Sequence, residues 1–108
     1  MRIIAGRLRG STLYLSKNKN IRPLKDLTRE SVFNLLIHSK KIAFQLEKSN
    51  VLDLYAGTGS FGLECLSRQA NYVCFIEKEK AAIEILEKNI EKLKLKNKQK
   101  YFLTTFLL

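Results

Sequence analysis

The stretch that decides the fold is a short apolar run followed at once by three glycines: Val51-Leu52-Asp53-Leu54-Tyr55-Ala56-Gly57-Thr58-Gly59-Ser60-Phe61-Gly62. Residues 51–55 are typical of a short buried strand, and the apolar spacing after the last glycine predicts a helix that lasts to about residue 69. A G-x-G-x-x-G pattern between a strand and a helix permits a tight turn, and it lets a ligand approach backbone N–H groups at the start of the helix. We therefore predict a ligand-binding strand–loop–helix unit.

The chain after this unit continues the alternation of strands and helices. Residues 72–76 are rich in β-formers, and residues 79–95 form the clearest predicted helix. One apolar stripe runs along that helix: Ala82, Leu86, Ile90 and Leu93. Residues 101–108 are apolar and predict a third buried strand. The order strand–helix–strand–helix–strand is typical of a parallel sheet with right-handed crossovers, so the predicted fold class is α/β.

The part of the chain before the glycine loop is predicted to be a basic arm followed by a helix. Short apolar pieces on either side of Gly6–Gly10 indicate two short strands in a hairpin or arm. Helical spacing then runs from Pro23 to about Ile37. A length of 108 residues allows one domain at most. We expect an arm at residues 1–22 and a ligand-binding domain at residues 23–108.

The positive charge lies mainly in the first half of the chain. Lys and Arg number 20 against 10 Asp and Glu, which gives a formal net charge of +10. Residues 1–50 hold 11 of the basic residues and 3 of the acidic ones, and five of the six arginines fall within the first 29 residues. Guanidinium groups suit phosphate recognition, so this pattern fits either a nucleic-acid contact or a solvated basic surface.

Several classes of protein are disfavoured by the sequence. No apolar run approaches the roughly 20 residues of a membrane-spanning helix, and the N-terminus does not resemble a secretory signal. Two cysteines without such a signal argue against a disulfide framework. We interpret His38, Cys65 and Cys74 as structural residues and predict no metal site. These features predict a soluble cytoplasmic protein.

Two acidic residues near the glycines indicate which ligand binds there. Glu77 follows Gly62 by 15 residues, at the end of the next strand, where a carboxylate can accept hydrogen bonds from a ribose diol. Asp53 would repel the pyrophosphate of a dinucleotide but attract the ammonium and sulfonium groups of S-adenosylmethionine. The alternatives are that Asp53 only caps the loop through backbone N–H groups and that Glu77 is a surface acid.

Four segments resemble bacterial 16S ribosomal RNA (guanine-N2)-methyltransferases of the RsmD type, which have a Rossmann-like fold. The segments occur in the order of that family: Ile3–Gly10, Arg22–Leu36, Leu52–Glu64 and Leu66–Arg68. Two departures stand out, because Leu24-Lys25 replaces a usual pair of threonines and Gln69 occupies a position where glycine is common. The resemblance covers nearly the whole chain, and it implies S-adenosylmethionine as cofactor and 16S rRNA, or the assembling small ribosomal subunit, as partner.

The resemblance also assigns roles to particular residues. It implies that Asp53, Gly57 and Gly59 line the methionine end of the cofactor and that Glu77 holds its ribose. The intervening loop residues belong to the same expected cofactor site: Tyr55, Ala56 and Thr58. Four arginines match basic positions of the family and imply contacts with RNA or with the cofactor pocket, unless they form ordinary surface or structural ion pairs: Arg7, Arg9, Arg22 and Arg29.

The family's catalytic loop is missing from this sequence. That loop carries Asn/Asp-Pro-Pro-aromatic after the fourth strand, and it positions a guanine whose exocyclic amine receives the methyl group. The only proline here is Pro23, so no residue is assigned a catalytic role. We expect the N-terminal half of the fold, with about three parallel strands, and no transferase activity from this chain alone. The alternatives are a non-catalytic RNA- or cofactor-binding remnant and a nicotinamide-cofactor half-domain.

Overall fold

The computed structural model describes residues 1–17, 26–39, 45–96 and 100–104. Helices and strands alternate along this part of the chain: α1 (Asp26–His38), β1 (Asn50–Leu54), α2 (Ser60–Ser67), β2 (Tyr72–Ile76), α3 (Lys80–Lys92) and β3 (Tyr101–Thr104). The strands form one parallel sheet in the order β1-β2-β3. The predicted strands and helices from residue 50 onward are confirmed to within a few residues. The predicted helix start at Pro23 and the end of the third strand, residues 105–108, lie outside the described residues.

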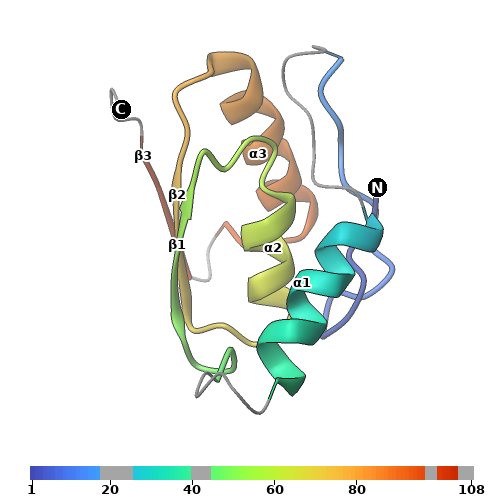
Figure 1. The fold of residues 1–108 in the computed structure, drawn as a ribbon. Helices are drawn as coiled ribbons and strands as arrows, with labels where there is room; N and C mark the ends of the chain where they lie inside the picture. Colours follow the sequence, from blue (N-terminus) through green and yellow to red (C-terminus); the bar gives the residue numbers. More distant parts are fainter. Residues whose placement is uncertain (18–25, 40–44, 97–99, 105–108) are drawn as a thin grey trace.

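The three helices lie on the same side of the sheet (Figure 1). Side chains alternate along a strand, and the register places Asp53 beside Phe75, both buried on the helix side. The opposite face carries Leu52, Cys74 and Phe102 in one row, with Leu52 59% and Phe102 52% exposed. The prediction that the first and third strands are buried is therefore wrong for this face. A parallel strand is buried on both sides only where helices cover both faces, and the described helices cover one.

The N-terminal segment, residues 1–17, is packed onto the domain rather than extended from it. Its antiparallel pairing consists of a single bridge between Arg2 and Thr12, so the predicted pair of hairpin strands is only partly correct. Ile3 is 1% exposed and Leu13 is 6% exposed, and both belong to the hydrophobic core. Burial of these two side chains fixes the segment against the helices without a regular sheet.

The end of α2 explains one departure from the family pattern. Gln69 follows the helix and has a φ of 75°, in the left-handed region that favours glycine. Its side chain is exposed, so the backbone conformation, rather than a lack of space, accounts for the glycine that is common at this position. Lys94 has the same kind of conformation after α3, with a φ of 59°.

The exposed leucines of β1 predict self-association of the purified chain. Leu52 and Leu54 lie on the bare face, and no other described strand pairs with the free edge of β1. Replacing both with glutamine (Leu52→Gln and Leu54→Gln) is expected to shift the mass measured by light scattering towards that of a monomer. Leu35→Gln, which removes a leucine that is 60% exposed on α1, is the matched control and should leave the mass unchanged. A monomeric profile for the unaltered chain would contradict the prediction.

Candidate cofactor site

The glycine loop connects β1 to α2 at the carboxyl end of the sheet. Gly57 has a φ of 60° and Gly59 a φ of 90°, so both adopt conformations that other residues rarely take. A Cβ on Gly59 would also collide with Leu86 of α3. The Gly59 N–H donates to the Ala56 carbonyl (3.0 Å), which closes the turn. The first two glycines of the motif are therefore required by backbone geometry.

Asp53 lies beneath this loop, near the end of β1, and is 9% exposed. Its carboxylate accepts a hydrogen bond from the N–H of Gly62 (3.1 Å). A Cβ on Gly62 would meet Phe75 and the Asp53 carboxylate, so the third glycine allows close packing of α2 on the sheet. Burial raises the pKa of Asp53 to about 6, with the negative charge of Glu77 adding to the rise and the Gly62 hydrogen bond opposing it.

Glu77 holds the loop to the end of β2. It is 8% exposed, and one carboxylate oxygen accepts from the Gly57 N–H (2.8 Å). The other oxygen accepts from the N–H groups of Lys78 (3.0 Å) and Glu79 (2.8 Å), just before α3 begins. This position also favours a carboxylate because of the α3 dipole. Glu77 is thus a buried loop anchor rather than a surface acid.

The remaining predicted loop residues differ in exposure. Ala56 is buried, and its N–H donates to the Ile76 carbonyl (2.9 Å), which continues the pairing of β1 with β2. Thr58 is buried at 4% exposure. Tyr55 is 69% exposed and has a φ of 55°, so its ring stands free on the surface at the point where the chain leaves β1. The structure brings all seven predicted cofactor residues to one edge of the sheet.

The predicted arginines do not share one environment. Arg7 and Arg9 are exposed on the N-terminal segment, and Arg22 lies outside the described residues. Arg29 is fully buried, which corrects the prediction of an RNA contact for this residue. Its guanidinium donates to the carbonyl oxygens of Arg2 and Ser60. Arg29 is therefore a structural residue, in agreement with the alternative that it forms a structural ion pair.

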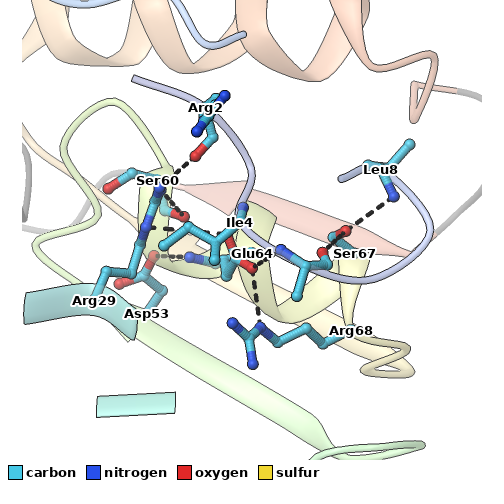
Figure 2. Close-up of polar contacts among 11 residues, drawn as sticks. Arg2, Ile4, Leu8, Arg29, Asp53, Ser60, Glu64, Ser67 and Arg68 are labelled. Atoms are coloured by element: carbon cyan, nitrogen blue, oxygen red, sulfur yellow. Dashed lines mark hydrogen bonds and ion pairs between the residues drawn. The ribbon is translucent and has the colours of Figure 1, made fainter. Parts of the chain in front are cut away.

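Glu64 is an acidic partner of Arg29 that was not predicted from the sequence. Glu64 is fully buried in α2 and lies 3.9 Å from the Arg29 Nε. Its carboxylate accepts from the N–H groups of Ile4 (2.9 Å) and Ala5 (3.0 Å) and from the Arg68 Nε (2.9 Å), as Figure 2 shows. The sequence feature that could have indicated this role is an acidic residue in the middle of an otherwise apolar predicted helix.

Ser67 and Asn89 are two further polar residues that the sequence reasoning missed. Ser67 is fully buried in α2, and its hydroxyl donates to the Ala5 carbonyl (2.6 Å) and accepts from the Leu8 N–H (3.0 Å; Figure 2). Asn89 is fully buried in α3 and contacts both the N-terminal segment and the glycine loop. Each interrupts the apolar side of a helix, which is the pattern expected of a buried polar tether.

The chain is similar to known proteins along nearly all of its length. The family described as "Conserved hypothetical protein 95" matches residues 1–107. The chain belongs to this family. Ribosomal RNA small subunit methyltransferase D from Haemophilus influenzae is 39% identical over 99 residues, covering 92% of this chain and 48% of that protein. The Escherichia coli protein of the same name is 38% identical over 97 residues, covering 90% and 46%. The predicted resemblance to the RsmD type is confirmed.

The solved structures support the same conclusion about the fold. The candidate methyltransferase yhhF from Escherichia coli superposes with a TM-score of 0.78 at 33% identity, covering 98% of this chain and 52% of that one. The predicted fold class, a Rossmann-like methyltransferase fold, is thus confirmed. The prediction that the chain corresponds to the N-terminal part of this family is confirmed as well. The chain spans about half the length of the curated relatives it matches.

Loss of the Glu64 charge is expected to destabilise the fold strongly. Glu64→Gln removes the buried negative charge that lies 3.9 Å from the Arg29 Nε and accepts a hydrogen bond from the Arg68 Nε, and breaking a buried ion pair typically costs about 3–5 kcal/mol. Urea unfolding followed by circular dichroism measures the change. Glu47→Gln alters an exposed acid and should change the free energy of unfolding by less than about 0.5 kcal/mol. A similar, small effect for both variants would show that the buried pair does not stabilise the fold.

Proposed function

We propose that this chain is the S-adenosylmethionine-binding part of an enzyme that methylates the exocyclic N2 of a guanine in small-subunit ribosomal RNA. The observation that carries the proposal is the pair of buried carboxylates, Asp53 and Glu77, beside a glycine loop at the carboxyl ends of two parallel strands. Ligands of open α/β sheets bind at this edge. Membership of the family and the names of its relatives support the same reaction class.

The charges around the loop fit this cofactor better than a dinucleotide. Asp53 and Glu77 place negative charge where a dinucleotide would bring its pyrophosphate. The ammonium of S-adenosylmethionine is attracted by the same charge, and the bound cofactor supplies an electrophilic methyl group. With a pKa of about 6, Asp53 is ionised at neutral pH and can bind that ammonium. A nicotinamide-cofactor half-domain is therefore the weaker alternative.

We assign the loop residues as follows. Asp53, Gly57 and Gly59 hold the methionine end, and Glu77 holds the ribose. The Glu77 carboxylate already accepts three backbone N–H groups, and a carboxylate has about four acceptor positions, so one remains for a ribose hydroxyl. The other loop residues line the same site: Tyr55, Ala56 and Thr58.

We propose that the RNA-facing surface includes Arg7 and Arg9. Both are exposed on the N-terminal segment, where guanidinium groups can bind phosphates. Arg22 is a further candidate from the sequence. The substrate is then 16S rRNA or the assembling small ribosomal subunit, and the expected location is the cytoplasm. In the described part of the chain, no helix combines the length and apolarity needed to span a bilayer.

Replacing Asp53 with asparagine (Asp53→Asn) separates cofactor binding from stability. Asparagine can still accept from the Gly62 N–H, but it lacks the charge that binds the ammonium. Isothermal titration calorimetry should show micromolar or tighter binding of S-adenosylmethionine to the unaltered chain, at least tenfold weaker binding to the variant, and no measurable binding of NAD. The affinity of the unaltered chain should fall as the pH drops below about 6, where Asp53 is protonated. Preferential NAD binding would overturn the proposal.

The same substitution is expected to stabilise the free protein above pH 6. The pKa of Asp53 rises from 3.8 to about 6 on folding, so the folded state holds more protons between these values and stability falls as the pH rises through this window. At pH 7 the ionised carboxylate then costs up to about 3 kcal/mol, which Asp53→Asn removes. Thermal unfolding at pH 7 and pH 4 measures the difference, which should disappear at pH 4. An equal gain at both pH values would contradict the electrostatic cause.

We expect no methyl transfer by this chain alone. The sequence lacks the Asn/Asp-Pro-Pro-aromatic loop that the resemblance requires for positioning guanine, since its only proline is Pro23. Incubation with labelled S-adenosylmethionine and either naked 16S rRNA or small-subunit particles should give incorporation at background level. Ribosomal RNA small subunit methyltransferase D from Escherichia coli serves as the positive control. Incorporation above background would show that the catalytic groups lie within these 108 residues.

A further inference from the structure

Asn89 joins two parts of the molecule that lie far apart in the sequence. It is fully buried in α3, and its side-chain oxygen accepts from the Tyr14 N–H (2.6 Å). Its side-chain nitrogen donates to the carbonyl oxygens of Tyr14 (3.2 Å) and Thr58 (3.0 Å). One amide group therefore binds the backbone of the N-terminal segment and the backbone of the glycine loop at the same time.

Three successive residues of the glycine loop are each held by a different side chain. Glu77 binds the Gly57 N–H, Asn89 binds the Thr58 carbonyl, and Leu86 fills the space above Gly59. Two of these side chains come from α3. The position of α3 relative to the loop therefore sets the orientation of the N–H groups that a ligand would meet.

The N-terminal segment contacts the same helix beside Asn89. The ammonium of Lys92, three residues further along α3, bonds to the Thr12 hydroxyl and lies 4.9 Å from the centre of the Tyr14 ring. Residues 12–14 thus lie along α3 and complete the hydrogen bonds of Asn89. Without Tyr14 in place, two of the three hydrogen bonds of this buried amide would be lost.

We propose that Asn89 is a positioning residue that couples the N-terminal segment to the cofactor loop. Docking of the segment at Tyr14 fixes the Asn89 side chain, which in turn holds the Thr58 carbonyl and the turn at Gly59. This inference rests on the proposed function for its ligand, S-adenosylmethionine. Because coupling between two sites is reciprocal, a ligand that fixes the segment also strengthens cofactor binding.

The first test is amide hydrogen exchange of the ligand-free chain, measured residue by residue with NMR. Asn89→Ala is expected to speed exchange at the Gly59 N–H about tenfold more than at the Val73 N–H in β2, as loss of one hydrogen bond implies. Ser31→Ala is the matched control, because the Ser31 hydroxyl donates to the Leu27 carbonyl within α1 (2.9 Å), away from both the N-terminal segment and the loop. This control variant should change the exchange rates of the Gly59 and Val73 amides by the same factor. If Asn89→Ala speeds exchange at Gly59 and at Val73 by the same factor, the proposal is overturned.

The second test is calorimetric binding of S-adenosylmethionine to the same variants. Asn89→Ala should weaken binding about tenfold, and Ser31→Ala should leave it within twofold. If the unaltered chain does not bind S-adenosylmethionine, the proposed function fails, while the exchange experiment still decides the role of Asn89. If Asn89→Ala does not fold, Lys92→Ala replaces it, since this exposed side chain holds Thr12 and Tyr14 from outside. Exchange at Gly59 should then rise two- to threefold more than at Val73, and equal factors would again overturn the proposal.

Discussion

The arrangement of this protein depends on one buried carboxylate, that of Glu64. It accepts hydrogen bonds from the backbone of Ile4 and Ala5 and pairs with Arg29 and Arg68, so it connects the N-terminal segment, α1 and α2. A buried charge is tolerated only where its partners are in place, because the cost of removing it from water is otherwise uncompensated. The three elements therefore dock on one another as a unit, and α2 in turn positions the glycine loop that precedes it.

The predictions from sequence were correct for features that local pattern determines, such as the bounds of strands and helices. They missed features that depend on residues distant in the sequence. Strand and helix bounds after residue 50 follow from apolar periodicity and glycine positions, and the structure has them within a few residues. Arg29 was predicted to contact RNA or the cofactor pocket because it matches a basic position of the family, with a structural ion pair as the alternative. Its position beside Glu64 could not be inferred from local pattern, since Glu64 lies 35 residues away in the sequence. The exposed face at Leu52 was missed for the same reason, since an apolar run cannot reveal which of its two faces a helix will cover.

The candidate site shows the same division between motif and environment. Spacing alone placed Asp53, Gly57 and Glu77 together, because the carboxyl ends of parallel strands meet at one edge of a sheet. Spacing could not show that Glu77 already holds three backbone N–H groups or that Asp53 binds the Gly62 N–H. Both carboxylates therefore shape the loop before any ligand arrives. A loop fixed in this way loses less conformational freedom on binding, which favours affinity for its ligand.

The N-terminal segment gains its fixed position from side chains rather than from strand pairing. With only one bridge of its own, it leaves backbone groups at Ile4, Ala5 and Tyr14 that need partners inside the protein. Glu64 of α2 and Asn89 of α3 supply them, and each does so from the buried side of its helix. The segment is thus held near its start by α2 and near its end by α3. The exposed Arg7 and Arg9 lie between these two contacts and are therefore held at a fixed place relative to the glycine loop. The proposed contact of these arginines with RNA requires such a fixed place, since substrate and cofactor must be aligned.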